Sequence, residues 1–265
     1  MLTLLLVFVL LGVVAGLMGG ALGLGGGVVI VPALLLVLPL LDGPAEIIMQ
    51  QAVATSLATI AFTSVSAIRG HWLRHAVRQD IVWPLAAGIV LGAFAGATFA
   101  SGVPGATLAR LFGLFAMVIS LQMALSSRRR ANDAPERLPG RAGLALSGGV
   151  IGAVSAMFGI GGGSMTVPFL SACRIHMQQA VAASAVCGLP IALGGATGFI
   201  IGGWQQPGLP AGSFGFVYLP AVAGIVLTSF PMARVGTRLA HRLPARALKR
   251  GFAVALFLIG LKLLL

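Results

Sequence analysis

Long apolar stretches separated by short polar segments form the main pattern along this chain. A helix needs about 20 apolar residues to cross the hydrocarbon core of a bilayer. The first stretch, 2–41, is longer than that but is interrupted by a run of glycines. Stretches of spanning length follow at residues 47–68, 81–100 and 107–125. The pattern therefore predicts membrane-spanning helices preceded by a broken apolar segment.

A polar connector at residues 126–141 separates this first group of stretches from a second one. The second group contains another long apolar stretch broken by glycines, 142–173, and spans at 178–201, 214–232 and 247–265. We therefore expect an all-α polytopic membrane protein in which each half is a Gly-broken helical hairpin plus three transmembrane helices. The predicted units are a first membrane repeat at 1–127, a cytoplasmic linker at 128–141 and a second membrane repeat at 142–265.

Two motifs recur in both halves in the same order. The segment G-L-G-G-G-V-V-I-V-P begins at Gly23, and G-I-G-G-G-S-M-T-V-P begins at Gly159. The segment M-Q-Q-A-V-A-T-S ends at Ser56, and M-Q-Q-A-V-A-A-S ends at Ser184. Apolar bias alone does not produce paired glutamines or a fixed order of glycine and proline. The two halves are therefore predicted to be an internal duplication.

Composition supports a membrane protein throughout. Of the 265 residues, 58% are hydrophobic and only 8% are charged, whereas roughly a quarter of the residues of a soluble domain are charged. The mean hydropathy is +1.04. The apolar run that begins at Leu2 has no basic segment before it and no clear cleavage signal after it, so we expect a retained membrane segment rather than a signal peptide.

The charged residues predict how the first half crosses the membrane. The chain has 17 Lys and Arg against 5 Asp and Glu, a net charge of +12. The basic residues gather in short loops, as positive-inside loops require, so no nucleic-acid partner is expected. The loop with Arg69, Arg74 and Arg78 and the connector at 126–141 are both predicted to be cytoplasmic. The turn at 101–106, which has no Lys or Arg, then lies outside.

The second half is predicted to run in the opposite direction. Its basic loop carries Arg234, Arg238, Arg242 and Arg246 and lies inside, while the uncharged loop at 202–213 lies outside. Matching elements are therefore antiparallel, an inverted-repeat architecture known in secondary transporters. We expect both termini on the extracytoplasmic side. Whether each broken stretch is a re-entrant hairpin or a pair of full spans stays open.

The two glycine runs are the first candidate binding site. Inversion would bring both breaks together near the bilayer midplane, where irregular backbone is tolerated only if protein buries it or water reaches it. A helix that begins after a break leaves free N–H groups and a partial positive charge, and glycines let an anion approach closely. The alternative is close helix packing through small residues. The candidates are Gly23, Gly25, Gly26, Gly27, Gly159, Gly161, Gly162 and Gly163.

Uncharged polar side chains near the breaks are the second candidate. Amides and hydroxyls can donate to a sulfonyl or carboxyl oxygen without a fixed charge; helix capping and interhelical hydrogen bonding are the alternatives. Ser164 and Thr166 stand where the first half has Val28 and Ile30, so the second break is the more polar one, unless these hydroxyls bond back to their own helix. The candidates are Gln50, Gln51, Ser56, Ser164, Thr166, Gln178, Gln179 and Ser184.

Several kinds of chemistry have no candidate residues. All five acidic residues fall in loops or at the ends of spans, which argues against a cation substrate bound by carboxylates. No Ser/His/Asp arrangement, metal-ligand cluster or acid pair is placed in a helix core, so we do not expect an enzyme. Cys173 and Cys187 have no ligand spacing. No cofactor and no metal are predicted.

The repeated G-x-G-G-G-x-x-x-x-P motif, the Q-Q-A-V-A-[TA]-S segment and the basic loop before the final span resemble the TauE/SafE family of sulfite and organosulfonate exporters. The resemblance covers both halves and essentially the whole chain. It implies a bacterial inner-membrane permease that acts without a nucleotide-binding domain on sulfite, sulfoacetate or another sulfur-containing or organic anion. The family's motif falls on the two glycine runs above, with Pro32 and Pro168.

These observations together predict a secondary transporter that exports a small sulfur-containing or organic anion. It would work by alternating access around a midplane site made by the two glycine breaks. An anion channel or facilitator is the alternative, because the same helix-dipole site would serve it. The expected partners are the anionic solute and the lipid bilayer, and a homodimer stays open.

Overall fold

The computed structural model describes residues 2–22, 26–41, 43–72, 78–125, 136–240 and 245–264. Two predicted site residues, Gly23 and Gly25, lie outside the described residues. In chain order the helices are α1 (Leu2–Leu22), α2 (Gly27–Val37), the single-turn 3₁₀ helices η1 (Leu38–Leu40) and η2 (Ala45–Ile47), α3 (Ile48–Trp72), α4 (Gln79–Ser101), α5 (Gly105–Leu125), α6 (Arg141–Met157), α7 (Gly163–Ala172), α8 (Met177–Gly202), α9 (Leu219–Ala240) and α10 (Ala245–Leu264).

The predicted helices are present, but one of them starts late. The apolar residues at 214–218 belong to a short hairpin of β1 (Ser213–Phe214) and β2 (Val217–Tyr218), not to the span predicted at 214–232. Gly215 turns the hairpin with φ +55°, a conformation that glycine adopts at little cost. α9 follows directly after Tyr218.

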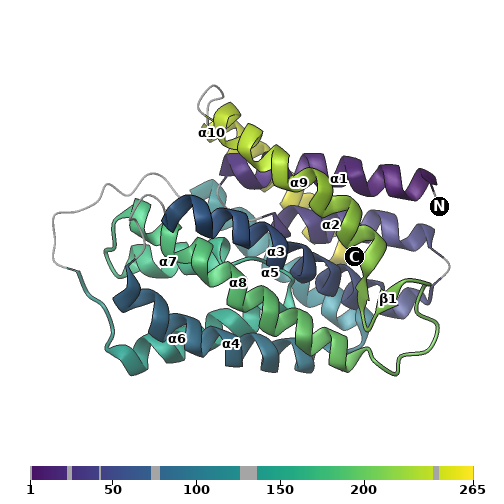
Figure 1. The fold of residues 1–265 in the computed structure, drawn as a ribbon, viewed down its shortest axis with the longest axis horizontal. Helices are drawn as coiled ribbons and strands as arrows, with labels where there is room; N and C mark the ends of the chain where they lie inside the picture. Colours follow the sequence, from purple (N-terminus) through teal and green to yellow (C-terminus); the bar gives the residue numbers. More distant parts are fainter. Residues whose placement is uncertain are drawn as a thin grey trace.

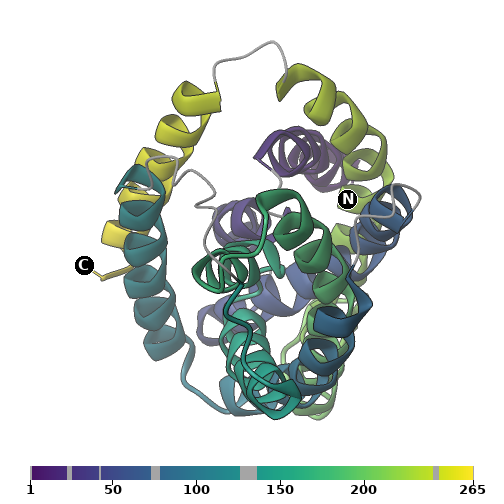
Figure 2. The same ribbon diagram turned by 90° about the vertical axis from the view of Figure 1, so that its left-hand side faces the viewer.

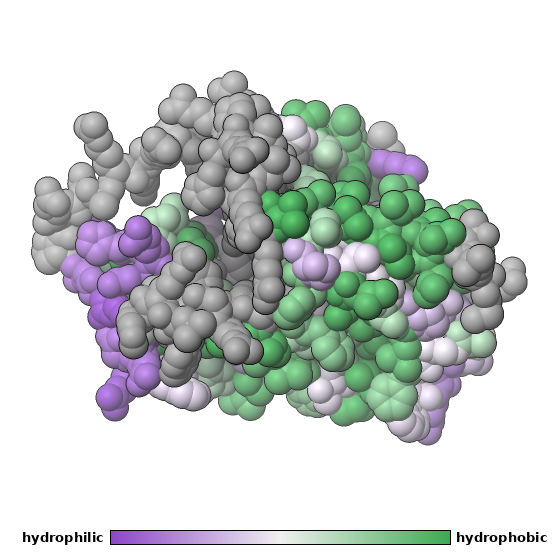
Figure 3. Space-filling view, turned by 45° about the horizontal axis from the view of Figure 1, so that its top comes forward, coloured by the Kyte–Doolittle hydropathy of each residue, from purple (hydrophilic) through white to green (hydrophobic). Residues whose placement is uncertain are grey.

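The surface of the molecule fits a bilayer. Among the described residues, four helical segments are long and apolar enough to cross one: Ala45–Val65, Gln79–Ser101, Gly105–Gln122 and Met177–Gly202. Shorter apolar segments lie in the remaining long helices and in α2. Figure 3 shows a broad hydrophobic band across the middle of one face, with hydrophilic residues at its two ends. The chain is a multi-pass membrane protein.

The helices are stacked in three levels (Figure 1). α1 packs on α9 at one side, α4 packs on α6 at the other, and α3 and α8 lie against each other between them. α5 and α10 pair along one edge, which is seen best along the bundle (Figure 2). In the span that includes α3, 72% of the residues are buried, against 39% in the α5 span, so α3 belongs to the interior.

Equivalent helices of the two halves have equivalent packing partners. α1 pairs with α9 as α6 pairs with α4, and α2 packs on α3 as α7 packs on α8. Likewise α3 contacts α9 as α8 contacts α4. The first helix of each half is therefore paired with a helix of the other half.

Small residues allow these helices to approach closely. Gly88, Gly92 and Gly96 are four residues apart on α4, and a Cβ added at any of them would collide with backbone of α6. A Cβ at Gly113 of α5 would lie 2.8 Å from the carbonyl oxygen of Gly260 of α10. Helices in lipid associate through such backbone-to-backbone packing, because burial from water does not drive them together.

The loops gather at two ends of the bundle. At one end, Gly43 lies against Pro210 and Gly202 lies against Ser101. These contacts lie in or beside the loops that follow η1, α4 and α8, which lack basic side chains. The hairpin of β1 and β2 lies at this end (Figure 1).

The opposite end carries a small network of charges. Arg78, just before α4, pairs with Asp80 at 2.6 Å and with Glu136 at 2.7 Å. Its hydrogen bonds to the two carboxylates raise the pKa of the Arg78 guanidinium above its usual value. The backbone N–H of Arg137 donates to the carbonyl of Cys173 at 3.1 Å. The segment before α6 is thus attached both to the start of α4 and to the end of α7.

Candidate functional site

The break after α6 is a helix terminus of the Schellman type. Gly159 has φ +66°, and the N–H of Ile160 donates to the carbonyl of Ser155 at 2.9 Å. The N–H of Gly159 donates to the carbonyl of Ala156 at 3.2 Å. These two bonds satisfy carbonyls that a helix end otherwise leaves free, and glycine is preferred where φ is positive. The sequence therefore ends α6 where the motif begins.

The next helix, α7, begins four residues later and exposes its amide groups to the break. Gly162 is its N-terminal flanking residue, and the first helical hydrogen bond runs from the N–H of Thr166 to the carbonyl of Gly162 at 2.8 Å. The N–H groups of Gly163, Ser164 and Met165 make no hydrogen bond within the described residues. A helix N-terminus of this kind carries a partial positive charge of roughly +0.5.

The start of α2 also has a glycine as its N-terminal flanking residue, but its first turn is tighter than that of α7. Gly26 flanks α2, and its carbonyl accepts from both Val29 and Ile30 at 3.0 Å. A bond to Val29 tightens the first turn as a 3₁₀ helix does. Among the described residues, the start of α2 therefore has fewer free amides than the start of α7.

The two breaks touch each other. A Cβ added at Gly27 would lie 2.6 Å from the carbonyl oxygen of Gly159 and 3.2 Å from the amide nitrogen of Gly161. The hydroxyl of Ser56, on α3, donates to the same Gly159 carbonyl at 2.8 Å. Residues of the first half are thus in direct contact with the backbone break of the second half.

The corresponding contacts in the second half are different. A Cβ at Gly162 would lie 2.7 Å from the carbonyl oxygen of Ser184 on α8. The hydroxyl of Ser184 does not reach across to the other half, because it donates to the carbonyl of Val181 in its own helix at 3.0 Å. Ser56 and Ser184 occupy matching places in the sequence but have different bonding partners.

Two of the four candidate glutamines, Gln50 and Gln178, lie away from the breaks. The Gln50 side chain donates from Nε2 to the carbonyl of Val103 at 2.7 Å, at the end of the bundle where α5 begins. Gln51 is buried, Gln178 is exposed and Gln179 is half-buried. Gln50 is six residues from Ser56, about 9 Å along a helix. The structure therefore brings the glycines and Ser56 together but leaves Gln50 and Gln178 outside this group.

The polar side chains next to the second break are buried and uncharged. Ser164 donates weakly to the carbonyl of Gly161 at 3.4 Å. Thr166 is fully buried, and its hydroxyl has no hydrogen-bond partner in the part of the chain that the structure describes. Ser155, which the sequence analysis did not select, is also fully buried with an unpaired hydroxyl. The sequence feature that could have identified Ser155 is its position one helical turn before Gly159.

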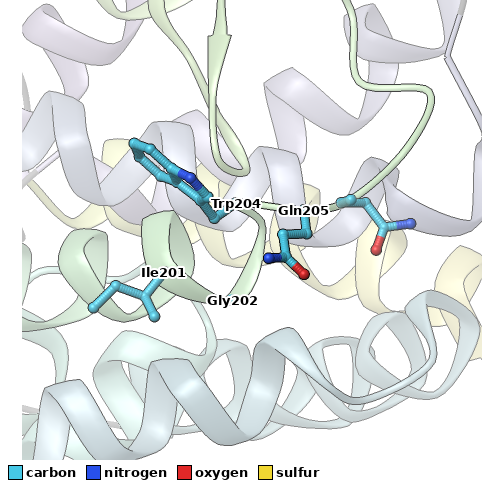
Figure 4. Close-up of a pocket in the computed structure, with 5 residues that line it drawn as sticks. Ile201, Gly202, Trp204 and Gln205 are labelled. Carbon is cyan, nitrogen blue, oxygen red and sulfur yellow. The ribbon is translucent and has the colours of Figure 1, made fainter.

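The second break is closed to solvent in this structure, since residues 159–164 are all buried, and so is Gly27, which lies against it. A hollow at the surface lies elsewhere, at the end of α8, and Figure 4 shows it lined by Ile201, Gly202, Trp204 and Gln205. Trp204 is mostly exposed and meets Phe214 edge-to-face at 5.1 Å. Exposed aromatic side chains at this level are typical of a membrane–water interface.

No metal site is present in the described part of the chain, where no group of three or more His, Cys, Asp or Glu side chains comes together. Cys173 and Cys187 are free and buried. The buried polar side chains of the described residues are Ser, Thr and Gln, and none is charged. What the breaks offer to a ligand is therefore backbone amides and hydroxyls.

Comparison with known proteins gives consistent results. The family model described as "Sulfite exporter TauE/SafE" matches residues 8–263. A "Probable membrane transporter protein" of Haemophilus influenzae is 36% identical over the full length of both chains. A protein of the same description from Methanocaldococcus jannaschii is 26% identical and is aligned over 100% of this chain and 97% of its own. No solved structure is significantly similar.

Proposed function

The chain belongs to the sulfite exporter TauE/SafE family and is a membrane transporter, and from this premise we propose that it exports a small sulfur-containing or organic anion, such as sulfite or an organosulfonate. The transport is secondary, without a nucleotide-binding domain, and takes place across the bacterial inner membrane. The substrate site is the pair of glycine breaks. Both termini are assigned to the extracytoplasmic side, in accordance with the distribution of basic loops.

The contact between the two breaks is the observation that carries this proposal. Gly27, at the start of α2, lies against Gly159 and Gly161 of the second break. Two irregular segments, far apart in the sequence, share one buried region among helices that span the membrane. Discontinuous helices that meet in this way form the substrate sites of many secondary transporters.

The chemistry of the buried region favours an anion. Helix N-termini attract negative charge through their free N–H groups, and α7 provides such a terminus. A cation would need carboxylates or several carbonyl groups, and the described residues bury no carboxylate. An anion that carries its charge on exposed oxygens matches the donors that are present.

The pairing of helices supports an inverted repeat and alternating access. The contacts of α1 with α9 have their counterpart in those of α6 with α4. The units 1–127 and 142–265, joined by the linker 128–141, would be related by a pseudo-two-fold axis in the membrane plane. Rocking of one group of helices against the other would then open the buried breaks first to one side and afterwards to the other.

Counterflow in proteoliposomes tests the proposal. Purified protein is reconstituted into vesicles loaded with sulfite or methanesulfonate, and uptake of the same labelled anion from outside is measured. We expect saturable uptake that is faster in loaded vesicles than in empty ones, because an alternating-access carrier returns faster when it is occupied. Flux that rises linearly with concentration would favour a channel, and no flux of either anion would contradict the substrate class.

A further inference from the structure

We propose that the hydroxyl of Thr166 and the free amides at the start of α7 form the oxygen-binding subsite for one singly charged oxyanion. This inference rests on the proposed function and deepens it, because it assigns the substrate to the second break rather than to both equally. The first break would serve as an apolar wall of the site.

The bonding of Thr166 differs from that of three other helical threonines, Thr59, Thr98 and Thr197. Threonines within helices commonly donate to the carbonyl four residues earlier. Thr59, Thr98 and Thr197 do so at 2.8, 2.9 and 2.8 Å, respectively. For Thr166 the carbonyl four residues earlier is that of Gly162, which flanks α7. The hydroxyl of Thr166 makes no bond to this carbonyl.

This unpaired hydroxyl is fully buried. Thr166 has 0% of its surface exposed, and no atom of the described residues accepts from its Oγ1. Leaving a buried hydroxyl without a partner costs about 1–3 kcal/mol. A ligand oxygen that accepts from Thr166 would remove this cost when the site is occupied.

The position of Thr166 directs its side chain toward the break. It is the fourth residue of α7, and helical side chains lean toward the N-terminus, over the preceding turn. The preceding turn contains the unbonded N–H groups of Gly163, Ser164 and Met165. Two kinds of donor, amide and hydroxyl, therefore face the same region. An anion with at least two terminal oxygens could accept from both.

The described start of α2 offers fewer donors than the start of α7. At the position that matches Thr166 stands Ile30, and at the position of Ser164 stands Val28; both are buried. The amides of Val29 and Ile30 are already bonded to Gly26. The hydroxyl donors of the subsite therefore come from the second half, which an exact repeat would not predict.

The absence of buried charged side chains in the described residues limits the charge of the substrate. A helix N-terminus supplies roughly half an elementary charge, which is suited to one negative charge. A second charge would be desolvated without compensation, at a large cost in a buried site. We therefore expect a sulfonate monoanion to bind and the sulfate dianion to be rejected.

The test is a binding measurement on the full-length protein in detergent, with methanesulfonate as the probe and calorimetry as the readout. Thr166→Val keeps the shape and removes the donor, so the Kd should rise about 10- to 100-fold. Thr166→Ser keeps the donor and should bind as the wild type does. Thr59→Val is the matched control, because Thr59 is also fully buried but is bonded within its helix.

Each outcome bears on the proposal. A Thr166→Val variant that binds methanesulfonate like the wild type would overturn the subsite, and continued saturable counterflow would leave the proposed function standing. Competition by sulfate is a second test, which needs only the wild type and so holds even if the variant fails to fold. If sulfate competes with labelled methanesulfonate as strongly as unlabelled methanesulfonate does, the subsite for a singly charged anion is overturned. A wild type that does not bind methanesulfonate and transports neither methanesulfonate nor sulfite would instead contradict the proposed function.

Discussion

Ser56 connects α3 to the break of the other half through one hydrogen bond. Its hydroxyl donates to the carbonyl of Gly159, the glycine with positive φ that ends α6. Because Gly27 lies against the same carbonyl, this bond fixes where the two breaks meet. The effect of Ser56 on transport should therefore exceed its effect on stability.

We expect Ser56→Ala to lower the counterflow rate while it reduces stability by only about 1 kcal/mol, the usual net value of one hydrogen bond. Ser120→Ala is a matched control. Ser120 is also buried and donates at 2.8 Å to a distant carbonyl, that of Ala253, but it joins α5 to α10 instead. Thermal unfolding should show similar losses for both variants, and counterflow should separate them. Equal transport rates would contradict the role given to Ser56.

The sequence predicts the backbone at the site better than the side-chain bonding. The G-x-G-G-G run marks the end of one helix and the start of the next because a positive φ requires glycine. Whether a hydroxyl bonds to its own helix depends on its rotamer, and Thr59 and Thr166 differ in this respect although both are buried threonines. The glutamine pairs were equally ambiguous, since Gln50 binds the backbone of Val103 near the end of the bundle.

At the scale of elements, the glycines of α4 determine how closely it can approach α6. Gly88, Gly92 and Gly96 form one face of the helix, four residues apart. Each would place an added Cβ against backbone of α6 rather than against a flexible side chain. A side chain there cannot be accommodated by a change of rotamer, so the helices would have to separate.

Gly92→Ala should therefore destabilise the protein by about 1–3 kcal/mol, the usual cost of overpacking. Gly251→Ala, in α10, is the control because nothing lies within 4 Å of its Cβ position. There the replacement should be neutral or stabilising by up to about 1 kcal/mol, because alanine favours a helix over glycine. Unfolding in detergent would measure both, and a neutral Gly92→Ala would contradict the close α4–α6 packing.

The positions of the helices follow from apolar length, except near the hairpin. Residues Phe214, Phe216 and Val217 were assigned to a span because they are apolar and adjacent to one. Tertiary contacts hold them in the hairpin instead. The ring of Phe216 packs edge-to-face on the ring of Phe199, with 6.3 Å between the ring centroids. The N–H of Tyr218 donates to the hydroxyl of Thr55 at 3.0 Å. Such partners are distant in sequence and cannot be found from hydropathy.

At the scale of the whole molecule, the two groups of loops define two faces. Ala106 is exposed near the end that lacks basic loops, and Gly140 is exposed near the end that carries Arg78 and Glu136. The positive-inside rule assigns the first face to the outside and the second to the cytoplasm.

Cysteine labelling tests this orientation. In a background with Cys173 and Cys187 replaced by alanine, a membrane-impermeant maleimide should label Ala106→Cys in intact spheroplasts. It should label Gly140→Cys only after the membrane is permeabilised. The reverse pattern would invert the proposed orientation, and labelling of both from outside would exclude it.

The sequence predicts the duplication, but not which helices become neighbours. The repeated motifs identify equivalent segments, and the basic loops predict their direction. The pairing of α1 with α9 and of α4 with α6 depends on the fit of small residues such as Gly12 against Ile225, which a single sequence does not reveal.

The pairing of α1 with α9 also determines the order in which the protein can be completed during synthesis. α1 precedes the other described helices in the chain, and its partner α9 follows all of them except α10. α1 must therefore remain in the lipid, with the face of Gly12 and Gly16 uncovered, until α9 has been made. Contacts between such distant segments form slowly. A ribosome that stalls in the second half would release a chain with α1 unpaired, a natural target for membrane quality-control proteases.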